Sequence, residues 1–221
     1  MNPSDAPTAA PSDAPTAVSK NPNHPAKGSS IRTDPIRNKK DIEKILALLS
    51  GNPRDSALFI LGIHTNLRAS DIVALTVGQV AHLEPGQELV TRDKKTSRYM
   101  VRSLAEPVVR ALRRWLSVHP RGTDKNAPLF LSQRSGAALT APALSRKVKA
   151  WCAQAGVTGG NYSSHSLRKT FAYHALNTFN QPVHLVSAAL GHKQLATTLT
   201  YLGVQDRQIR QLFMNTITDT K

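Results

Sequence analysis

The first 35 residues differ sharply in composition from the rest of the chain. They hold half of the 14 prolines and almost no large apolar side chains, and the run Pro-Ser-Asp-Ala-Pro-Thr-Ala occurs at 3–9 and again at 11–17. Such a segment buries too little apolar surface to offset the conformational entropy that folding removes. We therefore predict a disordered tail over residues 1–35 and one folded domain over residues 36–221.

The positive charge of the chain is confined to the part that we predict to fold. The 29 Lys and Arg residues exceed the 14 Asp and Glu residues by 15, whereas the charges of residues 1–30 cancel. A basic folded domain points to nucleic acid first and to an anionic membrane second. The membrane is disfavoured because no apolar run approaches the length of a spanning helix. We expect a polyanionic partner.

The number of cysteines and the composition of the N-terminus indicate the cellular compartment in which the protein resides. The single cysteine, Cys152, excludes an internal disulfide framework and suits a reducing environment. The N-terminal residues lack the basic and apolar stretches of a secretory signal. A cytoplasmic protein is the expectation.

Apolar residues recur with helical spacing over most of residues 36–221. Ile42, Ile45, Leu46 and Leu49 share one helical face, and the nearly apolar stretch 54–64 indicates a buried helix. Further helices are expected near 70–75 and over 106–116, 140–155, 164–178, 182–190, 197–202 and 206–214. Residues 88–93 and 98–103 are rich in β-formers and flank a polar turn, which predicts a hairpin. The fold class is therefore mainly α (α+β), a helical bundle with a small antiparallel sheet.

Polar residues at the predicted helix starts are candidate N-caps. Asn66 or Ser70 is expected to cap the helix near residue 70. Thr140 is expected to cap the helix over 140–155, and Ser164 is expected to cap the helix that begins at His165. Pro182 is expected to open the helix that ends near Gly191.

A constellation of reactive side chains lies in the last third of the chain. His165, Arg168, His192 and Tyr201 fall within 37 residues. An arginine neutralises the charge that grows on phosphoryl oxygens, and a histidine donates to those oxygens or moves a proton. A tyrosine hydroxyl can form a covalent phosphoryl link once it loses its proton, since its free pKa is about 10. These residue types indicate side-chain attack on a phosphodiester.

At these residues the chain resembles the tyrosine recombinases, also called the phage integrase family, over about residues 36–215. Four stretches carry the resemblance: His165-Ser166-Leu167-Arg168; Leu190-Gly191-His192 with Thr197, Thr198 and Tyr201; Thr65–Ile72, with Asn66 where glycine is usual; and Lys95-Thr96 in the predicted hairpin. Four matching boxes in the right order are far more specific than any one of them.

The resemblance implies how the scissile phosphate is held and attacked. Arg68 and Arg168 would grip its non-bridging oxygens, and His192 would donate to one of these oxygens. Tyr201 would attack, giving a 3′-phosphotyrosyl link and a free 5′-hydroxyl, while His165 assists removal of the phenol proton.

The resemblance also implies a general acid, a supporting carboxylate and the absence of a cofactor. Lys95 would protonate the leaving oxygen, and Asp71 would orient its neighbours. Lys94 is the alternative to Lys95, because a shift of one residue in a hairpin exchanges the two faces. The phosphotyrosyl bond conserves the energy of the broken bond, so neither a nucleotide nor a metal is expected.

Most members of the family carry a helical core-binding domain before the catalytic one, and here the proline-rich tail takes that place. The chain therefore resembles short, catalytic-domain-only members such as fimbrial switch recombinases. The partners implied are double-stranded DNA, a homotetramer on two duplexes and accessory DNA-bending proteins. In the family, the C-terminal segment often docks on a neighbouring protomer, for which Leu212, Phe213 and Met214 are suited; it could equally pack on its own domain.

Other interpretations remain open for several residues. Each histidine alone could simply lie at a helix end, and Arg68 could be an ion-pair partner of Asp71. The stripe of Arg110, Arg113 and Arg114 could contact the DNA backbone or form a solvated helix face. Trp115 and Trp151 are expected in the core.

Three functions are compatible with these residues. The first is a site-specific recombinase or integrase. The second is a recombinase-like DNA-binding regulator without catalysis, and the third is a topoisomerase-like enzyme that nicks and reseals DNA.

Overall fold

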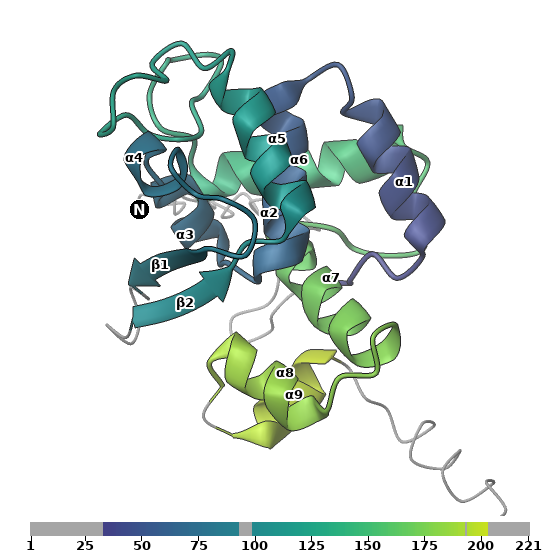
Figure 1. Ribbon diagram of the computed structural model, residues 1–221. Coiled ribbons are helices and arrows are strands. Elements are labelled where there is room, and N and C mark those ends of the chain that lie inside the picture. Colours follow the sequence, from purple (N-terminus) through teal and green to yellow (C-terminus); the bar gives the residue numbers. More distant parts are fainter. Residues whose placement is uncertain (1–32, 93–98, 193, 203–221) are drawn as a thin grey trace, which may run out of the picture. The chain divides into compact units, whose positions relative to one another are not determined.

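The computed structural model describes residues 33–92, 99–192 and 194–202 (Figure 1). The helices are α1 Lys39–Leu48, α2 Pro53–Thr65, α3 Ala69–Ala74, α4 Val77–Val80, α5 Glu106–Leu116, α6 Ala141–Gln154, α7 Ser164–Asn177, α8 Val183–Leu190 and α9 Leu195–Leu202. The strands are β1 Glu88–Arg92 and β2 Tyr99–Ser103. This mainly helical fold with a two-stranded antiparallel sheet confirms the predicted fold class. The predicted helix over 206–214 lies outside the described residues.

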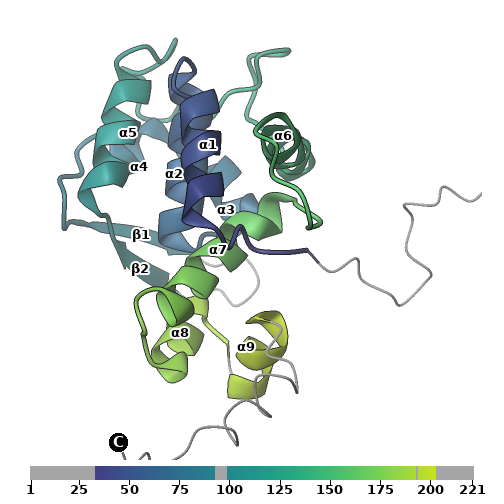
Figure 2. The ribbon, with the colours of Figure 1, turned by 90° about the vertical axis from the view of Figure 1, so that its right-hand side faces the viewer.

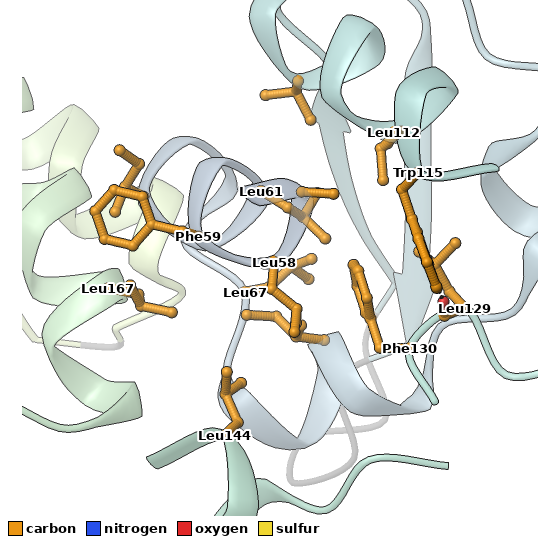
Figure 3. Packing of buried hydrophobic residues seen from close by; sticks show 14 of the residues in the cluster. Leu58, Phe59, Leu61, Leu67, Leu112, Trp115, Leu129, Phe130, Leu144 and Leu167 are labelled. Carbon is orange, nitrogen blue, oxygen red and sulfur yellow. Dashed lines mark hydrogen bonds between the residues drawn. The ribbon is translucent and has the colours of Figure 1, made fainter. Parts of the chain in front are cut away.

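Helix α2 is the centre of the hydrophobic core. Pro53 occupies its first turn and the Asn52 side chain accepts a hydrogen bond from Asp55 N at 3.1 Å, which fixes the start of the helix. Most of its side chains are buried, and those of Leu58 and Phe59, which pack in the core, have no exposed surface (Figure 3). The helix packs against both α5 and α7.

A glycine lets α7 approach α2 closely. A Cβ atom on Gly62 would lie 2.6 Å from Leu167 Cδ1, which is too close for non-bonded carbon atoms. Leu167 immediately precedes Arg168, so this contact brings the arginine up to the C-terminal end of α2. Here the sequence of one helix determines where a candidate site residue of another helix lies.

The observed caps correct two sequence predictions. Thr140 caps α6 as expected, but the N-cap of α7 is Ser163, whose hydroxyl accepts from His165 N, so the assignment of Ser164 is wrong. Neither Asn66 nor Ser70 caps α3. Its N-cap is Arg68, whose backbone N–H donates to the Asp71 carboxylate at 3.3 Å. The acidic residue at the third helical position thus accepts the backbone N–H of the N-cap residue, as in a capping box.

Strands β1 and β2 pair antiparallel, as predicted. In their register Val90 faces Val101 and Leu89 faces Arg102, and Leu89 is buried while Val90 is exposed. The strand pattern of alternating burial shows that one face covers the core and the other faces solvent. Lys94 and Lys95 lie outside the described residues.

Helix α7 connects the main core to a second, smaller hydrophobic cluster. Ala172, Val186 and Leu190 form this cluster, against which Tyr201 packs. Both views show α8 and α9 next to each other near α7, apart from the main group of helices (Figures 1 and 2). Gly191 ends α8 in the left-handed conformation with a φ of 67°.

Both tryptophans lie in the core, as predicted. Trp115 donates its indole N–H to Leu129 O at 2.7 Å, and Trp151 meets Phe59 edge-on. None of the helices in the described part of the chain combines the length and the apolar character that crossing a bilayer requires.

Candidate active site

Five of the side chains singled out in the sequence line one small cavity. It has a volume of about 140 Å³, and its lining comprises Arg68, Ala69, Ser164, His165, Arg168, His192 and Tyr201. These residues come from α3 and its N-cap, from α7, and from the region of α8 and α9. The cavity thus unites three segments that are distant in sequence.

Arg168 is buried, and backbone carbonyl groups hold its guanidinium. Nη1 donates to Asn66 O at 2.8 Å and Nη2 donates to Leu190 O at 2.5 Å. Burial lowers its pKa, and the neighbouring Arg68 lowers it further. A guanidinium fixed in this way is ready to receive an anion without reorganisation, which is the condition for strong electrostatic stabilisation.

The turn that precedes α3 presents Arg68. This residue is half-buried, and its backbone is tied to the buried Asp71, whose other oxygen accepts from Ser70 Oγ at 3.2 Å. The carboxylate of Asp71 therefore fixes the backbone from which Arg68 extends. The role of Asp71 in supporting a reaction, which the family resemblance implies, stays a prediction.

His165 lies one helical turn before Arg168 and keeps an exposed edge. Partial burial of the ring lowers its pKa below 6.5, and the positive charges of Arg168, Lys169 and Arg68 act in the same direction. The ring is therefore neutral at physiological pH. A neutral imidazole can accept a proton, as a general base must.

His192 follows the end of α8 and faces Tyr201. The two ring centroids lie 5.5 Å apart with the planes at 79°, an edge-on arrangement. Desolvation lowers the pKa of His192, followed by the charges of Arg168 and Arg68. Both histidines of the cavity are consequently neutral near pH 7 in the absence of a bound anion.

The phenol of Tyr201 is enclosed in the protein. Its Oη atom is buried and, within the described ranges, has no hydrogen bond of full geometry, although the Arg168 guanidinium is close enough to interact with it. Burial raises its pKa to about 12, although the nearby Arg168 opposes the shift. Lys169 Nζ lies 5.0 Å from the ring centroid. A phenol in this environment becomes a nucleophile only when a base takes its proton.

Sequence reasoning missed the partly buried guanidinium of Arg102 on β2, which interacts electrostatically with Arg168 and Arg68. Its Nε donates to Thr65 O at 2.8 Å and to Asn66 Oδ1 at 3.1 Å, and Nη1 donates to Thr91 Oγ1 at 2.7 Å. Burial, and next the charge of Arg168, lower its pKa to about 10. Its position on the inward face of the predicted strand was the signal available, since charged residues there need partners.

Residues 37–208 match the sequence profile of the phage integrase family. The chain belongs to the phage integrase family. The family resemblance stated from the four boxes is thereby confirmed, and the match spans α1 to α9.

Two relatives show how much of a phage integrase family protein the chain represents. It is 27% identical over 199 residues to tyrosine recombinase XerC of Caldanaerobacter subterraneus subsp. tengcongensis, covering 88% of this chain and 55% of the relative. It is 27% identical over 180 residues to the probable integrase/recombinase YoeC of Bacillus subtilis, covering 81% of this chain and 94% of the relative. The chain thus spans about half the length of XerC.

Solved structures of phage integrase family members share the fold. The XerA recombinase aligns with a TM-score of 0.66 at 21% identity, over 82% of this chain and 65% of that one. The XerH recombinase in its post-cleavage complex with a palindromic difH substrate aligns with a TM-score of 0.63 at 24% identity. This alignment covers 82% of this chain and 53% of the XerH chain. A lambda integrase dimer bound to a COC' core site aligns with a TM-score of 0.60 at 17% identity. This alignment covers 81% of this chain and 62% of the lambda integrase chain.

The remaining predicted DNA-contacting residues lie away from the cavity. Arg110 pairs with Glu106 at 2.9 Å, Arg113 pairs with Glu84, and Arg114 donates to Ser50 O at 2.7 Å. All three arginines are exposed on α5, so contact with the DNA backbone stays a prediction. Among the described residues, no group of three or more His, Cys, Asp or Glu side chains is arranged to hold a metal ion.

Proposed function

We propose that this phage integrase family member is a site-specific DNA recombinase that cleaves and rejoins DNA through a 3′-phosphotyrosyl intermediate. One observation carries the proposal: the cavity that contains the Tyr201 phenol is also lined by Arg68, Arg168 and two histidines. The relatives named as recombinases and integrases support the same activity.

The proposed reaction exchanges one phosphoester bond for another. Arg68 and Arg168 bind the non-bridging oxygens and stabilise the charge that builds on them. Tyr201 Oη loses its proton, assisted by His165, and bonds to phosphorus while the bond to the 5′-oxygen breaks. His192 donates to a phosphoryl oxygen, and Lys95 gives its proton to the leaving oxygen. The energy of the phosphoester is retained, so the reaction needs neither a nucleotide nor a metal.

The proposed assembly is a homotetramer on two double-stranded DNA sites in the cytoplasm, together with accessory DNA-bending proteins. An apolar groove of about 570 Å³ between α1, α2, α5 and α7 supports docking between protomers. In this proposal the groove receives the C-terminal segment of a neighbouring protomer through Leu212, Phe213 and Met214. The basic charge of residues 31–221 supports the DNA partner.

A nicked suicide substrate that carries the target site tests the chemistry. The wild-type protein should give a protein–DNA adduct that survives denaturing electrophoresis. Tyr201→Phe should abolish the adduct and leave DNA affinity nearly unchanged, because only the nucleophile is lost. Tyr173→Phe is the matched control, since Tyr173 lies on α7 outside the cavity lining, and it should form the adduct normally. An adduct with Tyr201→Phe would refute the proposed nucleophile.

Two further assays separate recombination from the other two functions. Relaxation of supercoiled plasmid that lacks a special sequence, without recombinant product, would identify a topoisomerase-like enzyme. Binding with no adduct on any flanking inverted repeat would identify a non-catalytic regulator.

A further inference from the structure

The last four carbonyl groups of α8 lack partners inside the helix, as at every helix end. They belong to Ser187, Ala188, Ala189 and Leu190. The chain that follows satisfies the first two, because His192 N donates to Ser187 O at 3.1 Å and Gly191 N donates to Ala188 O at 2.9 Å. The other two carbonyl groups depend on side chains from elsewhere in the fold.

Asn66 and Arg168 bind these two remaining carbonyl groups. Asn66 Nδ2 donates to Ala189 O at 2.7 Å. Arg168 Nη2 donates to Leu190 O at 2.5 Å, and its Nη1 donates to Asn66 O at 2.8 Å. His192, which lines the cavity, comes two residues after this helix end. The position of His192 therefore depends on how firmly the end of α8 is held.

The orientation of the Asn66 amide follows from partners that can act in only one way. Arg102 Nε donates to Asn66 Oδ1 at 3.1 Å, and a guanidinium has no acceptor atom. The backbone oxygen of Ala189 has no hydrogen to give, so it faces Nδ2. Arg102 is itself fixed by donating to Thr65 O at 2.8 Å and to Thr91 Oγ1 at 2.7 Å. One orientation of the amide therefore satisfies both of its partners, and Asn66 is only 3% exposed.

We propose that Asn66 is a positioning residue, whose side chain is oriented by Arg102 and holds the end of α8 in place for the reaction. This inference deepens the proposed function and rests on it. Without the Asn66 amide, the end of α8 loses one of the two cross-links described above and can move, and Leu190 and His192 move with it. Arg168 must then follow its acceptor Leu190 O or release it. Either change displaces the guanidinium from the geometry that the phosphate requires.

The backbone conformation of Asn66 offers a substitution that removes the side chain alone. Its φ of 50° lies in the left-handed region, where alanine is strained and glycine is not. Asn66→Gly therefore keeps the backbone carbonyl that accepts from Arg168. Asn180→Gly is the matched control, because Asn180 has a φ of 49° and is exposed between α7 and α8. Both changes raise the entropy of the unfolded chain alike, so their comparison isolates the contacts of the Asn66 side chain.

Amide hydrogen exchange of the free, full-length protein tests the geometry without any DNA. In Asn66→Gly the amides of Gly191 and His192 should exchange about tenfold faster relative to those of α2, because one hydrogen bond no longer supports the helix end. Asn180→Gly should leave these relative rates at the wild-type value. Unchanged exchange at the end of α8 in Asn66→Gly would overturn the proposal.

Cleavage of the suicide substrate tests the consequence for the reaction. Asn66→Gly should lower the rate of adduct formation at saturating protein about 10- to 100-fold, as a displacement of about 1 Å in a reactive site can do. DNA affinity should stay nearly unchanged, since the substituted side chain is buried. A lower free energy of unfolding with the wild-type rate would show a purely structural contact and overturn the proposal. Absence of cleavage in the wild-type protein, with the exchange difference as described, would refute the proposed function instead.

Variants of Arg102 test how the amide is oriented and do not require that Asn66→Gly fold. Arg102→Met removes the donor to Asn66 Oδ1 and should change both exchange and cleavage in the same direction by about three- to tenfold, the worth of about one hydrogen bond. Arg102→Lys keeps a cationic donor and should recover most of each loss. Wild-type exchange and cleavage in Arg102→Met would refute the orienting role of Arg102.

Discussion

The guanidinium groups and the phenol of the cavity are supported by two regions that differ in packing. Arg168 follows Leu167, which is fully buried against α2 in the main core. Tyr201 packs on a much smaller cluster in which Val186 and Leu190 are the largest fully buried members. Burial of apolar area is the main source of stability, so the arginine proposed to bind the phosphate is held more rigidly than the proposed nucleophile.

Polar contacts rather than apolar area join the two regions. Arg168 donates to Asn66 O on one side and to Leu190 O on the other. The Asn66 side chain, in turn, donates to Ala189 O at 2.7 Å. Asn66 adopts a φ of 50°, in the left-handed region that favours glycine, and its side chain gains two hydrogen bonds there. Asn66, which stands where the family usually has glycine, therefore stabilises this junction through its side chain.

The largest effect is expected at this junction. Arg168→Lys keeps the charge, but one ammonium group cannot hold both carbonyl oxygens and the phosphate in the geometry of the planar guanidinium. The rate of adduct formation should fall by about 10²- to 10³-fold or more, the typical loss when one donor to the transition state is removed. Arg113→Lys on the surface is the matched control. A variant within tenfold of the wild type would show that Arg168 serves structure alone.

Core substitutions compare the stability of the two regions directly. Leu58→Ala in α2 should lower the free energy of unfolding by about 2–5 kcal/mol, as expected for a fully buried leucine. Val186→Ala should cost about 1–2 kcal/mol, because fewer buried methyl groups are lost. Urea denaturation measures both costs, and amide hydrogen exchange should show α8 and α9 opening before α2. Equal costs and equal protection would contradict the comparison.

Alkaline titration measures how deeply the phenol is enclosed. The pKa of Tyr201 is about 12 in the folded protein and about 10 when unfolded, so the folded state holds the proton more tightly. The free energy of unfolding should therefore fall by at most about 1.4 kcal/mol per pH unit between pH 10 and 12. Tyr201→Phe should lack this component and gain stability relative to the wild type over that range. A difference between the two proteins that does not change with pH would show an accessible phenol.

The smallest effect is expected on the exposed face of α5. Arg113→Gln breaks a surface ion pair with Glu84 and should change the free energy of unfolding by no more than about 0.5 kcal/mol. If α5 follows the DNA backbone, the same substitution should reduce the salt dependence of DNA binding by about one phosphate contact. An unchanged salt dependence would assign the stripe of arginines to solvent.

Sequence periodicity predicted the described helices other than the short α4, and the two paired strands, because each depends on local patterns of apolar residues and breakers. The same patterns failed at Ser164 and at Asn66 or Ser70, where several polar residues compete to cap one helix start. Only the fold decides such a choice. At α3 the deciding contact is the carboxylate of Asp71, a residue for which the sequence suggests a role in the site and not in capping.

The reactive residues were identifiable because their spacing on α7 and near α9 is encoded locally. The contacts that position these residues could not be identified from the sequence. Arg102 reaches Asn66 across 36 positions, and Ser187 meets Thr198 from a different helix. Such pairs share no pattern in the chain, since they arise only when the helices and the hairpin pack together.

The most direct measurement of the central claim is the location of DNA on the trapped protein. The suicide-substrate adduct would be digested with protease and nuclease, and the modified peptide sequenced by tandem mass spectrometry. We expect a phosphonucleotide on Tyr201 and a released strand that ends in a 5′-hydroxyl. A phosphonucleotide on any other side chain, or DNA cleavage that leaves no protein-bound phosphate, would contradict the account.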